Sequence, residues 1–280
     1  MRRGHSAALT QGAITLRNSL KKGACLLALS AVGATSCQTT PVTDRRQLML
    51  VSDEALARES IKVFQEMRQK IPLVRDERLR KEVLAVSRQV IQATGEKLDW
   101  DVELFDSPQV NAFCLPGGKI GIFRGILPVA QTNGGLAAVI GHEVAHALAH
   151  HSAERASQAL VVDQVVGVLD ASLEGKQGKP LIVGALSFGA QLGLMLPFSR
   201  HQESEADTIG LEYMARAGYN PEEAVMLWVR MAALDPSKPP EWLSTHPDPR
   251  RRIRDLERLQ AKVRPVYQAQ ALKHPTQNLF

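Results

Sequence analysis

Five consecutive residues, His142-Glu143-Val144-Ala145-His146, combine the side chains that a catalytic metal site needs. On an α-helix, residues four apart lie on one face, so His142 and His146 can present their imidazoles to one metal ion. Glu143 lies one position round the helix, where its carboxylate can accept a proton from an attacking water molecule. Apolar neighbours make this helix largely buried, and buried polar side chains need partners such as a metal ion. The pattern therefore predicts a metal-dependent hydrolase.

Two imidazoles do not complete a catalytic zinc site, which takes a third protein ligand and keeps one position for water. A third histidine six residues after His146 is excluded, because Ser152 stands there. The remaining arrangement takes a glutamate from a later helix with an aspartate four residues further on, and Glu203 and Asp207 provide it. Glu205 points about 200° away from Glu203 round the helix. We therefore predict Glu203 as the third ligand and Asp207 as the acceptor that orients a ligand histidine.

Most of the chain has apolar residues at helical spacing, and only three short segments have the character of strands. The predicted helices cover residues 53–70, 76–94, 134–160, 163–173, 181–196, 202–217 and 250–263, and another begins at Pro221. The predicted strands cover residues 99–105, 110–115 and 119–126, with a turn at 116–118 between the last two. The apolar run 181–196 is short for a membrane span, which takes about 20 residues. The fold class is therefore α+β, mainly α.

The motif and its surroundings resemble the zinc metalloproteases related to HtpX and the CAAX prenyl protease, and among them the periplasmic lipoprotein branch typified by LoiP and BepA. The resemblance covers residues 41–263. Besides the two motif segments, it is carried by Arg45-Arg46-Gln47-Leu48, Asn111-Ala112-Phe113, Pro116-Gly117-Gly118, His151-Ser152-Ala153-Glu154-Arg155 and Ser244-Thr245-His246-Pro247 with Arg252. The chain departs from the pattern at Gly134-Gly135, where an acidic helix start is expected, and at Cys114, where alanine is common. The resemblance implies a gluzincin-type metalloprotease domain that binds one Zn²⁺ per chain.

The resemblance also implies roles for two residues that spacing alone does not single out. In the BepA-like relatives, a histidine equivalent to His246 can occupy the fourth zinc position and must leave it for catalysis. His246 is therefore expected to be a latch or a catalytic donor, with a packing contact as the alternative. Arg252 is a candidate to stabilise the oxyanion, or it forms a salt bridge on the last helix. Cys114 is interpreted as a small buried apolar residue.

Residues 1–36 have the pattern of an export signal, a basic segment followed by a short apolar run. Ala34-Thr35-Ser36-Cys37 resembles a bacterial lipobox, so Cys37 is expected to carry a lipid, unless it only follows an ordinary cleavage site. The net charge of +5 comes entirely from this leader, since residues 37–280 are formally neutral, and nucleic acid is therefore not an expected partner. The three cysteines of the chain exclude a disulfide framework.

The predicted organisation is a lipoprotein-type signal peptide at 1–36, a tether at 37–52, a zinc metalloprotease domain at 53–263 and a polar C-terminal tail at 264–280. The strand Lys119–Arg124, before the motif helix, is expected to be an exposed sheet edge on which an extended polypeptide substrate adds as a further strand. With a lipid anchor at the periplasmic face of the outer membrane of a Gram-negative bacterium, the expected function is an endopeptidase for unfolded or misassembled envelope proteins, outer-membrane proteins above all. The alternatives are a zinc-stabilised periplasmic chaperone with latched or minor proteolysis, and hydrolysis of a non-protein amide.

Overall fold

The computed structural model describes residues 37–161, 198–235, 237 and 239–279. The predicted signal peptide and the helices expected over 163–173 and 181–196 lie outside these residues. The strands are β1 (Cys37–Thr39), β2 (Arg46–Leu48), β3 (Asp101–Phe105), β4 (Ala112–Leu115) and β5 (Lys119–Phe123). The helices are α2 (Asp53–Lys70), α3 (Glu77–Thr94), α4 (Leu127–Ala130), α5 (Asn133–Leu148), α8 (Arg200–Arg216), α9 (Glu222–Ala232), α10 (Glu241–Thr245) and α11 (Pro249–Ala269). The predicted α+β class, mainly helical, is confirmed.

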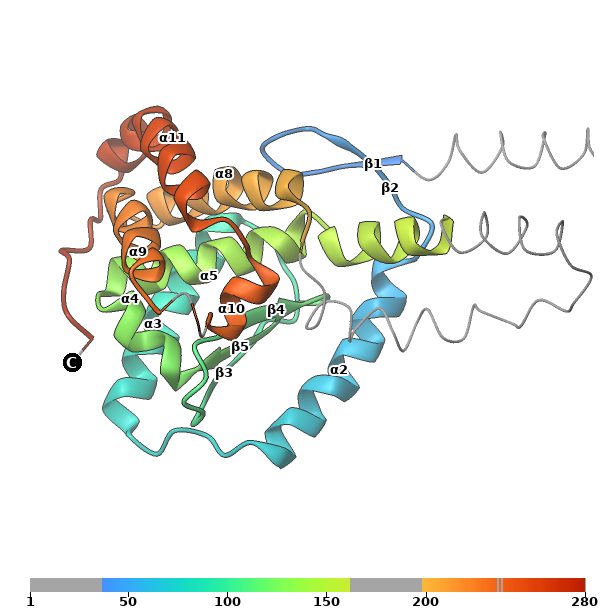
Figure 1. Ribbon diagram of the computed structural model, residues 1–280, viewed down its shortest axis with the longest axis horizontal. Helices are drawn as coiled ribbons and strands as arrows, with labels where there is room; N and C mark the ends of the chain where they lie inside the picture. The colour runs from blue at the N-terminus through green and yellow to red at the C-terminus, as the bar shows by residue number, and fades with distance from the viewer. Residues whose placement is uncertain (1–36, 162–197, 236, 238, 280) are drawn as a thin grey trace, which may run out of the picture.

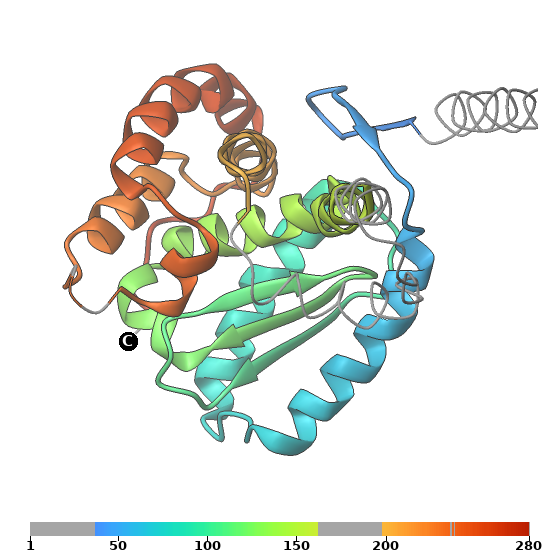
Figure 2. The same cartoon turned by 45° about the vertical axis from the view of Figure 1, so that its right-hand side comes forward.

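A three-stranded sheet lies at the centre of the fold, with β5 parallel to β3 on one side and antiparallel to β4 on the other. Side chains alternate between its two faces. One face carries Leu104, Ile120 and Ile122, which join the main core with α3 and α5. The other face carries an aromatic cluster with α2, made up of Phe64, Phe105, Phe113, Leu115 and Phe123. Figures 1 and 2 show the sheet between these helices, and the motif helix α5 is thereby held against a rigid layer.

The strand that precedes α5 is not a sheet edge, so the prediction of an exposed edge at Lys119–Arg124 is wrong. β5 is the middle strand, and each of its five residues is buried. The tight turn at Gly117 and Gly118, which both have positive φ, folds β5 back onto β4, and β3 occupies the opposite edge. The predicted strand also ends early, because Arg124–Ile126 form a 3-10 turn that leads into α4. The edge strands of this sheet are β3 and β4.

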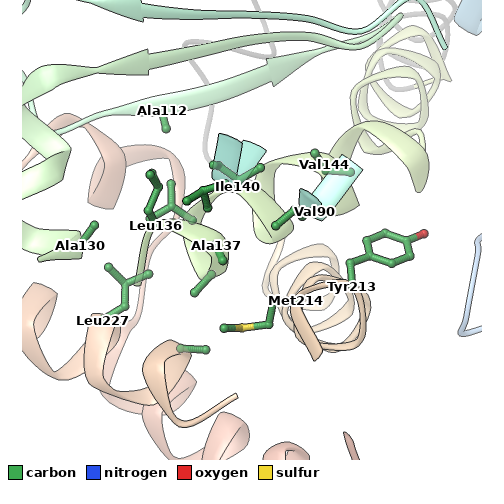
Figure 3. Packing of buried hydrophobic residues seen from close by; sticks show 14 of the residues in the cluster. Val90, Ala112, Ala130, Leu136, Ala137, Ile140, Val144, Tyr213, Met214 and Leu227 are labelled. Carbon is green, nitrogen blue, oxygen red and sulfur yellow. The ribbon is translucent and has the colours of Figure 1, made fainter. Parts of the chain in front are cut away.

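Helices α5 and α8 pack at very close range, because each has a glycine at the crossing point. A Cβ atom added to Gly141 would lie 2.7 Å from the Gly210 carbonyl oxygen, and one added to Gly210 would lie 2.7 Å from the Gly141 carbonyl carbon. Larger side chains at this point would therefore push the two helices apart. Figure 3 shows apolar residues of the core that these two helices share, among them Leu136 and Ile140 of α5 and Met214 of α8. This packing brings the motif histidines close to the acidic residues of α8.

The helix predicted over 134–160 is interrupted after the motif. α5 ends at Leu148, His150 adopts a left-handed conformation with φ 51°, and a new helix is described over residues 151–161. The break turns the chain, so that His151 faces back towards the motif instead of continuing its helical row. Sequence periodicity could not show this turn, because the residues on both sides of it are equally good helix formers.

The two ends of the described chain pack onto the core. Residues 37–48 form the β1–β2 hairpin, which lies beside the start of α8 (Figures 1 and 2). Residues 264–269 continue α11, and the chain that follows returns to the start of α5, where Asn133 N–H donates to the Gln277 carbonyl and Leu279 is buried. Among the described residues, the helices are all too short or too polar to cross a lipid bilayer.

Candidate metal centre

Four side chains from three parts of the chain converge on one buried point. His142 and His146 come from α5, Glu203 comes from the first turn of α8, and His246 follows α10 directly. The Nε2 atoms of His142 and His146 lie 3.0 Å apart, and His246 Nδ1 lies 3.2 Å from His142 Nε2. Glu203 Oε1 lies 3.3 Å from His146 Nε2 and 3.1 Å from His246 Nδ1. The structure thus brings together the three ligands predicted from the sequence and places His246 beside them, the residue for which the resemblance implied a latch or a catalytic donor.

This arrangement fits a zinc ion in both chemistry and size. Four ligand atoms placed tetrahedrally about 2.1 Å from zinc are about 3.4 Å apart. The four spacings given above, 3.0–3.3 Å, are close to this value, and all four ligand atoms lie within 4.8 Å of one another. Burial lowers the pKa of His146 well below its usual value, so its ring is neutral and can offer a lone pair. Although burial opposes it, the neighbouring His246 and Arg252 lower the pKa of Glu203 well below the usual range. Zinc binds neutral imidazoles and an ionised carboxylate. His142 differs from His146, because burial opposes the charged ring but the hydrogen bonds with Asp207 and Glu203 outweigh it and raise the pKa of His142, so a proton competes with zinc for this ring.

Glu143 lies beside this cluster, as expected for the group that handles the proton. Its side chain is buried, and Oε1 accepts a hydrogen bond of 2.7 Å from the indole N–H of Trp242 in α10. The same oxygen lies 3.3 Å from His246 Nε2. The indole therefore fixes the carboxylate within reach of the fourth position of the cluster. The sequence alone does not single out Trp242, because only the docking of α10 places it there.

Asp207 and Arg252 form a buried pair next to His142. Arg252 donates from Nε to Asp207 Oδ2 at 2.7 Å and from a terminal nitrogen to Glu203 Oε2 at 2.5 Å, and its guanidinium lies over the Trp228 ring. Asp207 Oδ1 lies 3.3 Å from His142 Nδ1, the nitrogen that faces away from the cluster, and a terminal nitrogen of Arg252 lies 2.9 Å from the same atom. Although burial opposes it, Arg252 lowers the pKa of Asp207. This position suits the predicted role of Asp207, while Arg252 holds two carboxylates, and its oxyanion role stays a prediction.

A phenylalanine that sequence analysis missed covers the other side of the cluster. The Phe198 ring stacks on His146 with centroids 3.8 Å apart and lies 5.4 Å from the His246 ring. The guanidinium of Arg155 lies 3.9 Å from the centre of the Phe198 ring, and burial lowers the pKa of Arg155 to about 10. Aromatic cover of this kind excludes water from the cluster.

Cys37 begins β1 outside the cluster, and Cys114 is buried in the core.

Comparison with known proteins agrees with this geometry. The sequence profile of peptidase family M48 matches residues 74–260, which include all four residues of the cluster and Glu143. The chain is similar to the mitochondrial metalloendopeptidase OMA1 of Schizosaccharomyces pombe, with 42% identity over 179 residues that make up 62% of this chain and 51% of that protein. The OMA1 metalloendopeptidase of Danio rerio is 33% identical over 247 residues, 80% of this chain and 50% of the relative.

The chain is also similar to a bacterial protease. The β-barrel assembly-enhancing protease of Escherichia coli is 27% identical over 210 residues, which cover 72% of this chain and 43% of that protein. The chain therefore spans about half the length of the curated relatives that it matches. The profile match extends over most of the described residues and contains the whole metal cluster. The chain belongs to peptidase family M48.

Proposed function

We propose that this protein is a zinc-dependent endopeptidase. The observation that carries the proposal is the convergence of His142, His146 and Glu203 on one point, with the Glu143 carboxylate beside it. Three protein ligands plus an adjacent carboxylate are what a zinc hydrolase needs. Membership of peptidase family M48 supports the same reaction, since peptide-bond hydrolysis is the activity for which the matched relatives are named.

The chemistry divides between the metal and the protein. When bound, zinc acts as a Lewis acid that polarises the scissile carbonyl group and makes water acidic enough to attack near neutral pH. Glu143 accepts the proton of the attacking water and delivers it to the leaving amine. The Trp242 indole orients Glu143 for both transfers, because it holds Oε1 in a fixed position. Asp207 and Arg252, which both lie beside Nδ1, keep the His142 ring turned so that Nε2 faces the metal.

The substitution Glu143→Gln tests the role assigned to Glu143 as the group that accepts and delivers the proton. The amide keeps the shape of the side chain but cannot take a proton, so cleavage of an unfolded substrate such as casein should fall by about 10²–10⁴-fold. Zinc content, measured on the purified protein, should stay at one ion per chain. Glu203→Ala provides the matched comparison, because it should lose zinc and cleavage together. If Glu143→Gln cleaves casein at the wild-type rate, the proposed mechanism is wrong.

His246 supports a latched state of the enzyme. Its Nδ1 atom stands at the fourth corner of the cluster, the position that a catalytic zinc site leaves open for water. We therefore propose that His246 blocks the site and must leave before substrate is cleaved. His246→Ala should then raise casein cleavage while zinc stays bound. A loss of cleavage would instead make His246 a catalytic donor, and an unchanged rate would leave only its packing contacts.

We propose that the substrate is an extended polypeptide that pairs with the outer edge of β4. Among the described residues β4 pairs with β5 alone, and it contacts the motif helix α5. The four residues of β4 are themselves buried, so the proposal concerns the main-chain groups of its outer edge. Strand addition uses main-chain hydrogen bonds and depends little on side chains, which suits unfolded proteins. A peptide substrate with N-methyl groups on alternate amides should therefore be cut more slowly than its unmethylated form. Equal rates for the two peptides would exclude this binding mode.

We also propose that the protein acts at the periplasmic face of the outer membrane as a lipoprotein, within the branch typified by LoiP and BepA. The export pattern of residues 1–36 and the lipobox ending at Cys37 support this location. The β-barrel assembly-enhancing protease of Escherichia coli supports outer-membrane proteins as substrates. Labelled fatty acid should be incorporated into the protein in cells and not into its Cys37→Ser variant. A wild-type protein without label would rule out the anchor.

A zinc-stabilised chaperone is the second candidate, and the position of His246 at the cluster favours it, because a blocked site cannot cleave. The two candidates separate in cells that lack the wild-type gene. If the Glu143→Gln form restores outer-membrane protein assembly in such cells, the chaperone function dominates. If it does not restore assembly while the wild-type protein does, proteolysis is the function that matters.

A further inference from the structure

A hydrogen-bonded row of buried polar side chains connects the metal cluster to the β1–β2 hairpin. His146 Nδ1, the ring nitrogen that faces away from the cluster, lies 2.8 Å from His151 Nδ1. His151 Nε2 in turn lies 3.0 Å from Glu205 Oε2, and both of these side chains are almost fully buried. The left-handed turn at His150 directs His151 inward, and Glu205 reaches it from the face of α8 opposite Glu203.

The hairpin supplies the far end of this row. Arg45 donates from Nε to Glu205 Oε2 at 2.7 Å, and the Thr40 hydroxyl donates to Glu205 Oε1 at 2.8 Å. The remaining guanidinium nitrogens of Arg45 bind both oxygens of Glu154, at 2.7 and 2.9 Å. The hairpin is thus attached to α8 and to the helix over 151–161 through its arginine.

If His146 binds a metal through Nε2, the donor and the acceptor of each hydrogen bond in this row of side chains are determined. A guanidinium only donates hydrogen bonds, so Glu205 acts as an acceptor and His151 must donate to it from Nε2. In a neutral ring the other nitrogen of His151 then has no hydrogen and accepts one from His146 Nδ1. His146 thereby has its hydrogen on Nδ1, which leaves the lone pair of Nε2 directed at the cluster.

We propose that Arg45, Glu205 and His151 are positioning residues that fix the tautomer and the ring orientation of the metal ligand His146. The β1–β2 hairpin then contributes to the metal centre, because its Arg45 holds the Glu205 carboxylate to which His151 donates. This inference rests on the proposed function only for its effect on zinc. The tautomers of His146 and His151 can be read in the metal-free protein as well.

Two substitutions of His151, by asparagine and by leucine, test the proposal, because these two side chains have nearly the same shape as each other. His151→Asn can place its amide oxygen where Nδ1 now lies and so still accept the hydrogen of His146, whereas His151→Leu cannot. Loss of such a partner weakens metal binding by about 10–100-fold. We expect His151→Leu to bind zinc that much more weakly in a chelator competition, and His151→Asn to restore most of the affinity. A packing role alone predicts no advantage for the asparagine, so equal affinities of the two variants would overturn the proposal.

A second measurement requires neither zinc nor activity. In the metal-free wild-type protein labelled with ¹⁵N-histidine, long-range ¹H–¹⁵N spectra should show the hydrogen of His146 on Nδ1 and that of His151 on Nε2. The opposite tautomers would refute the inference even if zinc binds and casein is cleaved. The expected tautomers in a chain that binds no zinc would leave this inference standing while the proposed function fails. Arg45→Met should shift the histidine signals, whereas Arg46→Met, a neighbour outside the chain of contacts, should not.

Discussion

Two arginine–carboxylate pairs lie on opposite faces of α8, and each serves one histidine of the motif. Arg252 from α11 binds Asp207, which lies beside His142. Arg45 from the β1–β2 hairpin binds Glu205, which reaches His146 only through His151. The chemistry is the same in both, an ionised carboxylate held by a guanidinium, but the second pair acts over one additional ring.

Their surroundings differ as well. The Arg252 side chain is 4% exposed and stacked on Trp228, whereas that of Arg45 is 21% exposed. A charge pair that water can reach costs less to break than one that is sealed. The difference suggests that the Arg252 pair belongs to the folded core, while the Arg45 pair adjusts the site from the periphery. Variants of each arginine can separate these two roles.

The largest effect is expected for Arg252→Met. Removing one partner of a buried ion pair leaves an uncompensated charge and costs about 3–5 kcal/mol. Here both Asp207 and Glu203 lose their cation, so the free energy of unfolding in urea, measured without metal, should fall by about that amount. Arg252→Lys keeps the charge but not the two-sided geometry and should lose less. A decrease under about 1 kcal/mol for Arg252→Met would show that the pair is not part of the core.

A change at the helix crossing should disturb both pairs at once. A Cβ atom at position 210 would lie 2.8 Å from the backbone nitrogen of His142, so Gly210→Ala must displace α8 from α5. We expect a loss of about 1–3 kcal/mol in unfolding free energy, typical of overpacking, together with weaker zinc binding. Gly134→Ala, in α5, is the control, because the three atoms nearest its Cβ would all belong to the side chain of Glu223 and not to the backbone of another helix. Equal stability of the two variants would mean that the close contact is dispensable.

Arg45→Met should cost less than Arg252→Met. Hydrogen bonds to charged groups contribute about 1.5–3 kcal/mol each when buried, and part of this is offset here because water can reach the site of Arg45. We expect a decrease of about 2 kcal/mol in the unfolding free energy of the metal-free protein. If Arg45→Met is as damaging as Arg252→Met, the hairpin is part of the core and the contrast between the two pairs disappears.

The sequence could predict the role of one carboxylate, Asp207, but it predicted neither of the two pairings with arginine, for a physical reason. Asp207 lies four residues after Glu203, and helical periodicity alone puts both on one face with the motif. The same periodicity correctly turned Glu205 away from Glu203, but its partner Arg45 lies 160 residues earlier in the chain. Nothing local encodes a contact of that range. The order of the strands is a similar case, because a short buried strand such as β5 has the same composition at an edge and in the middle.

The smallest predicted effect concerns pH and the peripheral pair. Burial opposes the ionisation of Glu154, but the hydrogen bonds from Arg45 and Gln202 outweigh it and lower the pKa of Glu154 below its usual value. A carboxylate with a lowered folded-state pKa stabilises the protein above the unfolded pKa of about 4.5, and this stability is lost as pH falls through the folded value. Wild type should therefore be more stable than Glu154→Gln at pH 7, and the difference between their urea midpoints should shrink as the solution is made more acidic than pH 4.5. Because the substitution leaves Glu205 and His151 in place, zinc affinity at pH 7 should change little. If the difference between the two urea midpoints stays constant with pH, Glu154 acts through its shape. The charge of Arg45 would then stabilise the Glu205 carboxylate alone.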